Sequence, residues 1–251
     1  MAIVVEDLSF SYGGPMTLRD ITFRASEGRF TVLLGKNGSG KSTLLKLISG
    51  MLPYRHGRIE ILGKELKQLR PSGRAGLIGY LPQFHSPVFP FTVEEVVLTG
   101  RASYVFSVPG RKDIDKADAA IEKVGIHHLR RRSYTELSGG ERQLVMIARV
   151  LAQDPKVIVF DEPLSHLDLS NQSRLLALIR DFVASGMTVL AVLHDPNAAF
   201  LFADDILFIK EGVLRNLQGD TKPWDRELLR DVYGTEVDAV PFRDRALVIL
   251  S

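Results

Sequence analysis

Cysteine is absent from the 251 residues of this sequence, which excludes disulfide bonds and thiolate metal sites. A surplus of charge of either sign is also absent, because 32 lysines and arginines stand against 30 aspartates and glutamates. This balance disfavours a surface built around nucleic acid, so we expect no nucleic-acid partner. A chain without cysteine also suits a reducing compartment.

Long hydrophobic runs are missing too. No apolar stretch approaches the roughly 18 residues that a membrane-spanning helix needs, and runs such as VIVF and TVLAVL have the length of strands. The opening residues, MAIVVEDLSF, contain two acidic residues and no basic leader, so they do not resemble a signal peptide. We therefore expect a cytoplasmic protein that reaches a membrane only through a partner.

Apolar residues make up 45% of the chain, enough for a full core. Short apolar runs alternate with helical patterns at both ends of the sequence, which predicts an α/β fold with a mostly parallel sheet. From Thr92 the pattern becomes helical, and Thr92 and Glu95 have the spacing of a capping box. We expect a helical insert over 84–155 in a core of residues 1–83 and 156–219, followed by a helix and two strands over 220–251.

A phosphate-binding loop is predicted between the apolar run RFTVLL and the helical pattern that follows it. Residues 35–42, GKNGSGKS, match G-x-x-x-x-G-K-[ST], in which backbone N–H groups surround nucleotide phosphates. Lys41 adds a positive charge, and Ser42 offers a hydroxyl to magnesium. A chance glycine-rich turn is the alternative, which the flanking strand and helix disfavour. The predicted nucleotide-binding residues are Gly35, Lys36, Asn37, Gly38, Ser39, Gly40, Lys41, Ser42 and Thr43.

Two acidic residues follow a second apolar strand in KVIVFDE. Ligands of such sheets bind at the carboxyl ends of the strands, where Asp161 and Glu162 would lie. We expect Asp161 to hold magnesium and Glu162 to polarise the attacking water as a general base. An acidic pair that merely ends a strand is the alternative.

The stretch LSGGERQ, residues 137–143, begins another predicted helix. Ser138 and Glu141 have capping-box spacing, which is a purely structural explanation for both. That explanation leaves out the two glycines between them, which weaken a helix. Bare amides at a helix N-terminus bind anions. Because the chain already has a phosphate loop, this second site is expected to serve the nucleotide of another copy.

Seven motifs in this order resemble those of the ATP-binding subunits of ABC transporters. Residues 35–42 resemble Walker A, 157–161 Walker B and 137–143 the signature motif. The other matches are Gln83 in the Q-loop, Glu162 as the catalytic glutamate, Asp168 in the D-loop and His194 as the switch histidine, with Tyr12 placed to stack on adenine. The resemblance implies a single ABC ATPase domain over 1–251, with an N-terminal antiparallel β-subdomain and a helical subdomain bearing the signature.

The resemblance further implies a head-to-tail homodimer that encloses two ATP molecules with magnesium. Glu162 and His194 would be catalytic, and magnesium would be held by Ser42, Gln83 and Asp161. The residues expected to contact the nucleotide of the opposite subunit are Ser138, Gly139, Gly140, Glu141 and Asp168. In this sequence Lys36 stands where the family commonly has proline, and Leu164 where it commonly has threonine.

Partners and cargo are also implied by the resemblance. The subunit would sit on the cytoplasmic side of the plasma membrane, bound to integral-membrane permease subunits and served indirectly by an extracytoplasmic binding protein. The expected docking surface, with subdomain core as the alternative, holds Phe84, Phe89, Phe91, Tyr104 and Phe106. FTVEEVVLTGR and LLRDVYGTEVDAV resemble importers of metal chelates (iron–siderophore, haem, cobalamin) or of molybdate and tungstate, and LPQFHSPVF inclines toward the molybdate branch.

Three alternatives share some of these motifs. A small-molecule kinase with a phosphate loop would not explain LSGGERQ or His194. A non-transport ABC ATPase, such as an iron–sulfur assembly subunit, is harder to separate, because it is also a short chain. An exporter ATPase would share every catalytic residue.

Overall fold

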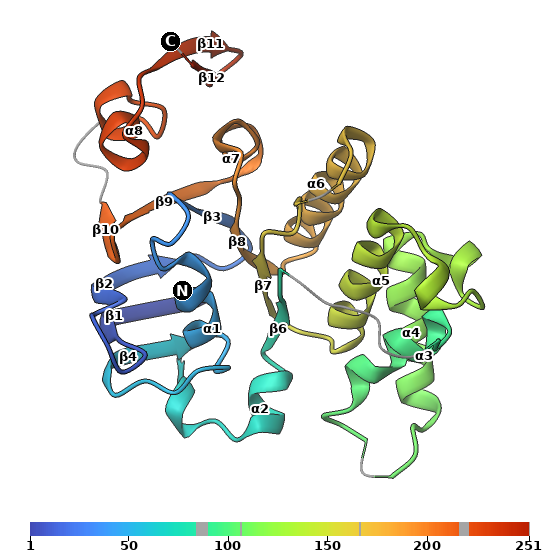
Figure 1. Cartoon of the computed structure of the whole chain (residues 1–251). Helices are drawn as coiled ribbons and strands as arrows, with labels where there is room; N and C mark the ends of the chain where they lie inside the picture. Colours follow the sequence, from blue (N-terminus) through green and yellow to red (C-terminus); the bar gives the residue numbers. More distant parts are fainter. Residues whose placement is uncertain (84–89, 106, 166, 216–220, 251) are drawn as a thin grey trace.

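The computed structural model describes residues 1–83, 90–105, 107–165, 167–215 and 221–250. Two sheets form the body of the molecule, a group of helices lies to one side of it, and the C-terminal elements lie together at the opposite end (Figure 1). No helix in this described part of the chain is both long and apolar enough to cross a membrane.

The N-terminal sheet is antiparallel and has the strand order β2-β1-β4-β5. Its strands are β1 (Ile3–Phe10), β2 (Leu18–Ala25), β4 (His56–Ile61) and β5 (Lys64–Glu65). Ile21, Phe23 and Ala25 of β2 are buried while the residues between them are exposed, which is the alternation of a sheet with one covered face. The N-terminal antiparallel subdomain expected from the resemblance is confirmed.

The central sheet has the order β10-β9-β3-β8-β7-β6 and is parallel except for β10. Its strands are β3 (Phe30–Leu34), β6 (Ile78–Leu81), β7 (Val157–Asp161), β8 (Thr188–Val192), β9 (Asp205–Lys210) and β10 (Val213–Arg215). Every residue of β3, β7 and β8 is buried, as expected of parallel strands covered on both faces. The carboxyl ends of these three neighbours therefore meet at one edge, where such sheets bind ligands.

Successive side chains of the central strands enter two different cores. Phe160 and Ala191 pack on one face of the sheet with the helices after residue 90, whereas Val159 and Val192 pack on the other face with the first helix and the N-terminal sheet. The period of two residues assigns each side chain to its face. Because each strand contributes to both cores, the edge that they share is held from both sides.

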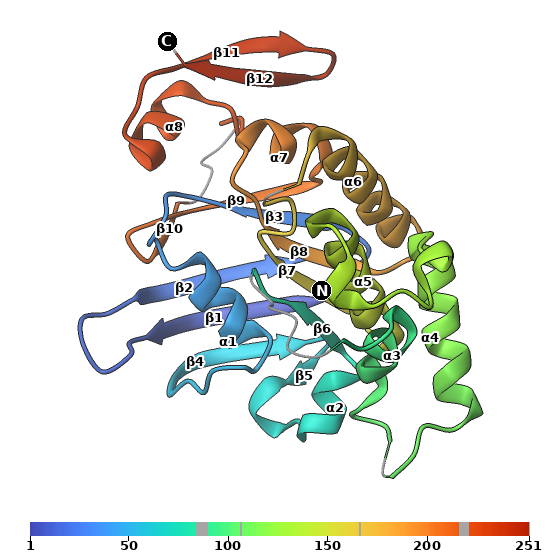
Figure 2. The ribbon, with the colours of Figure 1, turned by 45° about the vertical axis from the view of Figure 1, so that its right-hand side comes forward.

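The helices cover these faces (Figure 2). They are α1 (Lys41–Ile48), α2 (Pro71–Ala75), α3 (Val93–Leu98), α4 (Arg111–Val124), α5 (Gly139–Ala152), α6 (Leu169–Ala184), α7 (Pro196–Phe202) and α8 (Arg226–Tyr233), with 3₁₀ turns η1 (Leu66–Gln68), η2 (Thr99–Arg101), η3 (His127–Leu129) and η4 (Tyr134–Glu136). The predicted capping box of Thr92 and Glu95 begins α3, and that of Ser138 and Glu141 begins α5. Both predictions are confirmed.

One boundary inside the apolar run AGLIGYLPQ is not marked by its pattern. Ala75, which begins this run, ends α2, and β6 begins only at Ile78. Pro71 at the first helical position favours a short helix there, since its fixed φ suits the first turn. The α/β fold itself is confirmed, while the division into residues 1–83 with 156–219, 84–155 and 220–251 stays a prediction.

The C-terminal unit, residues 221–250, consists of α8 and a hairpin of β11 (Val237–Phe242) and β12 (Arg245–Leu250). The helix and two strands expected there are confirmed. Figure 2 shows the hairpin above α7 and α8 beyond β9 and β10. Leu229 and Val232 of α8 are buried in the same core as Phe200 of α7, so the unit is packed onto the body rather than attached by chain alone.

Candidate nucleotide site

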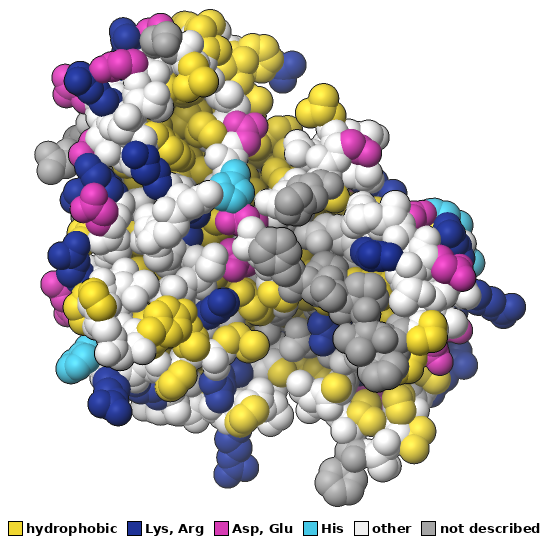
Figure 3. Space-filling view, viewed as in Figure 1, with side chains coloured by type: hydrophobic (Ala, Val, Ile, Leu, Met, Phe, Trp, Pro, Cys, Tyr) yellow, Lys and Arg dark blue, Asp and Glu magenta, His cyan; other side chains and the backbone are white. Residues whose placement is uncertain are grey.

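A polar cavity of about 380 Å³ lies at the carboxyl edge of the central sheet. Figure 3 shows a histidine beside acidic side chains near the middle of this face. The cavity is lined by Thr17, Asn37, Gly38, Gly40, Lys41, Ser42, Thr43, Gln83, Glu162 and His194. Nine of these ten were predicted from the sequence. Thr17 was not, because nothing in the local pattern connects the start of β2 with the loop after β3.

The loop after β3 can follow its path only with glycine at two positions. A Cβ on Gly35 would lie 2.2 Å from the carbonyl oxygen of Ile209, and one on Gly40 would lie 2.6 Å from Leu18 Cδ2, while Gly40 also has a φ of 101°. Glycine alone tolerates both the contact and the positive φ. Gly40 and the first residues of α1 line the cavity, where phosphate oxygens fit a helix N-terminus.

Lys41 is almost fully buried beneath this loop. Its Nζ donates hydrogen bonds to the carbonyl oxygens of Gly35 (2.7 Å) and Lys36 (2.9 Å). Burial lowers the pKa of Lys41, and the carboxylates of Glu162 and Asp161 oppose that shift. A buried cation held by two carbonyls and facing two acids is a suitable partner for a phosphate group.

Asp161 ends β7 with only 3% of its surface exposed. The hydroxyl of Ser42 donates to Asp161 Oδ1 at 2.9 Å, and the hydroxyl of Tyr80 donates to Oδ2 at 3.3 Å. Burial raises the pKa of Asp161, which both hydrogen bonds counteract. A carboxylate and a hydroxyl oxygen this close together form a donor set that suits Mg²⁺.

Glu162 follows with a φ of 54°, a left-handed conformation that costs a non-glycine residue about 1–3 kcal/mol. Its Oε2 accepts hydrogen bonds from Gln83 Nε2 and from Ser165 Oγ (3.4 Å), and it lies 2.7 Å from His194 Nε2. The strained backbone thus directs the carboxylate between the ends of β6 and β8. The structure brings the predicted Gln83, Glu162 and His194 into one group.

Tyr12 lies beside the start of α1. Its hydroxyl is 3.3 Å from Thr43 Oγ1, and Phe10 packs edge-on against its ring with centroids 4.8 Å apart. The ring is 62% exposed, so one face is open to a base. Stacking on adenine stays a prediction.

The signature residues lie elsewhere. Ser138 caps α5 as predicted: the Glu141 amide donates to its Oγ at 3.3 Å, and its own amide donates to Glu141 Oε2 at 2.8 Å. The Ser138 amide and the Ser138 hydroxyl, which donates to the same Oε2 at 2.8 Å, lower the pKa of Glu141. Ser138 and Gly139 are exposed and do not line the cavity around Lys41. The capping box accounts for the serine and the glutamate, and it leaves Gly139 exposed and Gly140 half-buried.

Asp168 caps α6 and accepts two hydrogen bonds from Asn171, at 2.8 Å from the backbone N–H and 3.1 Å from Nδ2. The side-chain amide of Asn171 also lies against Gly140, because a Cβ added to Gly140 would lie 2.7 Å from Asn171 Nδ2. Asp168 and Gly140 therefore meet through one side chain. Neither reaches the chain's own cavity.

Sequence reasoning missed Tyr80 and Ser165, which contact the two acids. Tyr80 lies on β6 in register with Val159 of β7, and this adjacency follows from the strand order rather than from any local pattern.

Phe84, Phe89 and Phe106 of the predicted docking surface lie outside the described residues. Phe91 and Tyr104 are exposed at 49% and 44%.

The sequence profile of the ABC transporter family matches residues 18–165, which is more than half of the chain. This chain belongs to the ABC transporter family. It is an ATP-binding cassette, and cassettes of this family are ATPases that drive transport. Nucleotide binding at the cavity around Lys41 agrees with that membership.

Relatives and solved structures agree with the family. The chain is 43% identical over 220 residues to the hemin import ATP-binding protein HmuV of Rhizobium etli, covering 84% of this chain and 83% of that protein. A metal-chelate type ABC transporter in an inward-facing conformation superposes with a TM-score of 0.86 at 31% identity, over 100% of this chain and 97% of that one. A dimeric ATP-binding cassette, MJ0796, bound to ADP and phosphate superposes with a TM-score of 0.74 at 26% identity, over 85% and 97%.

Proposed function

We propose that this ATPase subunit closes as a head-to-tail homodimer around two ATP molecules and drives import of a metal chelate through a membrane permease. The observation that supports it most directly is the separation of two half-sites. Lys41, Ser42 and Glu162 line one cavity, while Ser138 and Gly139 are exposed elsewhere on the surface. Two copies placed head to tail supply each cavity with the missing half.

Within one half-site, Lys41 and the amides of residues 35–43 bind the phosphates of ATP. Ser42, Asp161 and Gln83 would hold Mg²⁺, which would supply positive charge to balance that of the phosphates. Tyr12 stacks on adenine. Glu162 accepts the proton of the attacking water, which contributes about 10²–10⁴ in rate for general-base catalysis. His194 positions that water and the γ-phosphate.

The second half-site comes from the partner copy. Ser138 and the amides of Gly139 and Gly140 contact the γ-phosphate held by the opposite subunit, as a helix N-terminus does for an anion. Glu141 holds Ser138 in place through the capping box. Asp168 reaches across the interface beside Gly140, to which Asn171 links it.

Light scattering on Glu162→Gln tests this arrangement. With Mg-ATP the variant is expected to change from monomer to dimer, because it binds nucleotide without consuming it. Adding Ser138→Arg should abolish the dimer and leave ATP binding by the monomer intact. If Ser138→Arg removes ATP from the monomer instead, these residues belong to the chain's own site and the head-to-tail arrangement is wrong.

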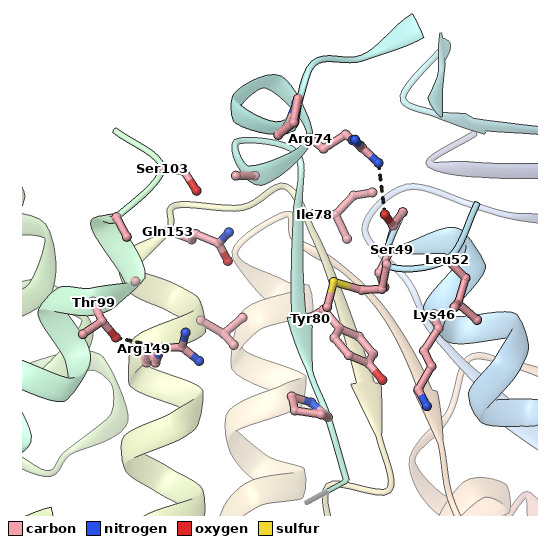
Figure 4. Close-up of a pocket in the computed structure, with 18 residues that line it drawn as sticks. Lys46, Ser49, Leu52, Arg74, Ile78, Tyr80, Thr99, Ser103, Arg149 and Gln153 are labelled. Carbon is pink, nitrogen blue, oxygen red and sulfur yellow. Dashed lines mark hydrogen bonds between the residues drawn. The ribbon is translucent and has the colours of Figure 1, made fainter. Parts of the chain in front are cut away.

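A groove of about 690 Å³ between α1, β6 and the helical region is the proposed docking site of the permease. Figure 4 shows Lys46, Leu52 and Tyr80 on one wall and Thr99, Ser103 and Arg149 on the other. Gln83 follows β6 directly, so an occupant of the groove lies close to the nucleotide cavity. The walls are largely apolar with a few polar groups, and such a groove fits an amphipathic helix.

Ala102 is an exposed residue in this groove, so a substitution there can test the docking site. Ala102→Glu is expected to prevent co-purification with the multi-helix permease while ATP turnover of the free subunit is retained. A subunit bound in this way lies at the cytoplasmic surface of the membrane without a span of its own. Recovery of the permease with Ala102→Glu would place the docking site elsewhere.

The proposed cargo is haem or another iron chelate, which the names of the similar proteins support, and molybdate is the alternative. Cargo contacts the permease and the extracytoplasmic binding protein rather than this subunit. Stimulation of ATP turnover in the reconstituted complex by a haem-loaded binding protein, but not by a molybdate-loaded one, would support haem. The reverse pattern would favour the oxyanion.

A further inference from the structure

The C-terminal unit, residues 221–250, contacts the segments that follow two strands of the nucleotide site, β3 and β8. On one side it touches the phosphate loop: a Cβ on Gly234, the left-handed residue that ends α8, would lie 2.8 Å from Lys36 Nζ. Lys36 therefore extends from the phosphate loop to the C-terminal end of α8, where a cation is favoured by the helix dipole. Its carbonyl oxygen is one of the two that hold Lys41.

Tyr233, the last residue of α8, connects the phosphate loop with the segment after β8. Burial raises the pKa of its hydroxyl, the Asp195 carboxylate raises it further, and the backbone of Gly35 opposes both, which places the hydroxyl within reach of the Gly35 backbone. The hydroxyl is enclosed and forms no hydrogen bond of ordinary geometry within the described residues. Asp195 directly follows His194 and caps α7 through the Asn197 amide at 2.8 Å.

The hairpin of the C-terminal unit holds the other end of that segment. Asn197 of α7 bonds Val248 twice, donating to its carbonyl at 3.0 Å and accepting from its amide at 2.7 Å. Arg245 donates to the last carbonyls of α7, those of Phe200 and Ala203, at 2.8 Å each. The unit thus fixes α7 at both ends, and His194 immediately precedes this helix.

The unit is itself anchored from the sheet. Asp231 of α8 pairs with Lys210 of β9 at 2.7 Å and with Arg215 of β10 at 3.2 Å. Trp224 packs edge-on against Phe200, with ring centroids 6.1 Å apart. These contacts hold the C-terminal unit against β9, β10 and α7.

We propose that Tyr233 and Arg245 are positioning residues for ATP hydrolysis. The C-terminal unit keeps the phosphate loop and the His194 segment at a fixed separation, so that Lys41 and His194 act on the same γ-phosphate. Neither residue touches the nucleotide. The proposal rests on the ATPase function proposed above and adds a second, remote determinant of its rate.

Two matched pairs of variants test this role. Tyr233→Ala is compared with Tyr54→Ala, which removes another tyrosine whose enclosed hydroxyl has no hydrogen-bond partner among the described residues, but from the N-terminal core. Arg245→Ala is compared with Arg174→Ala, since Arg174 caps α4 through the carbonyls of Val124 and Gly125 at 3.0 and 2.9 Å. Each pair thus loses similar contacts near the site and away from it.

Misplacement of a catalytic group by about 1 Å can lower the reaction rate about a hundredfold. Tyr233→Ala and Arg245→Ala are therefore expected to lower kcat by about tenfold to a hundredfold, with KM for ATP within about threefold of the parent. Tyr233→Phe, which keeps the ring packed against the core, should restore kcat. Trp224 is the only tryptophan, so a red shift of its emission reports loosening of the unit.

Equal kcat in all four alanine variants, with the red shift present in Tyr233→Ala or Arg245→Ala, would show that the unit only stabilises the fold. If Tyr233→Ala does not fold, Arg245→Ala with its control decides alone. A parent protein without ATPase activity would refute the proposed function rather than this positioning role.

Discussion

Gly139→Ala separates the structural explanation of the signature glycines from the functional one. A Cβ at Gly139 would meet no atom within 4 Å, and its φ is not positive, so alanine fits the folded subunit without strain. Alanine is favoured over glycine in a helix by up to about 1 kcal/mol. The substitution should raise the free energy of unfolding by about 0.5–1 kcal/mol and Tm by about 1–4 °C for a chain of this size.

Activity should change in the opposite direction. The methyl group would stand where the amide of Gly139 is proposed to approach the γ-phosphate of the partner's ATP. Steady-state ATP turnover is expected to fall at least about tenfold, since removal of one phosphate-stabilising donor commonly costs a factor of this order or more. Nucleotide affinity of the monomer should remain unchanged, because Gly139 does not line the cavity around Lys41.

Three measurements check this prediction: thermal unfolding, nucleotide binding by the isolated subunit, and phosphate release. Gly140→Ala is the internal comparison, because its Cβ would press on Asn171 at 2.7 Å and alter the monomer as well. A Gly139→Ala protein with higher Tm and full turnover would show that the glycine pair only begins α5. The second phosphate site would then be refuted.

Three further outcomes are expected. Glu162→Gln should bind ATP normally and lose about 10²–10⁴ in turnover, a barrier increase of about 3–5 kcal/mol, measured by single-turnover phosphate release; parental turnover would remove the glutamate from its role. Burial raises the pKa of Asp161 above its ordinary 3.8, so the cost of its charge to the fold is absent below about pH 4, grows as pH rises from there to the folded-state pKa, and is constant above it. The stability of Asp161→Asn relative to the parent should therefore rise as pH increases from about 4 in nucleotide-free denaturation, and parallel pH curves would contradict this cause. Tyr12→Ala should raise the Kd for ATP by about fivefold or more, in line with the roughly 1–3 kcal/mol of a base–aromatic contact, while Tyr12→Trp should not; similar Kd values in both would argue against stacking.

The parts of the site that could be predicted are those whose geometry is determined by residues close together in the sequence. The loop over residues 35–42 needs its glycines where the turn occurs, and the capping box of Ser138 and Glu141 spans only three residues. Asp161 lies at the end of a strand as expected, because the four residues before it are apolar and buried. In each case the residue type and its neighbours in sequence carry the physical constraint.

Contacts between distant segments could not be predicted in this way. Tyr80 reaches Asp161 because β6 is the neighbour of β7, and Gln83 reaches Glu162 for the same reason. The order of parallel strands depends on packing of the whole sheet rather than on the sequence of any one of them. The docking of Tyr233 against Gly35 likewise joins residues about two hundred positions apart.

The hydrogen bonding of Glu162 has a consequence for how the three strand ends act on one another. Its Oε2 is engaged by Gln83, Ser165 and His194 together, and these side chains follow β6, β7 and β8. A displacement of any one of these segments therefore changes the contacts of the same oxygen. The carboxylate proposed as the base thus links the groove beside β6 with the segment that precedes α7.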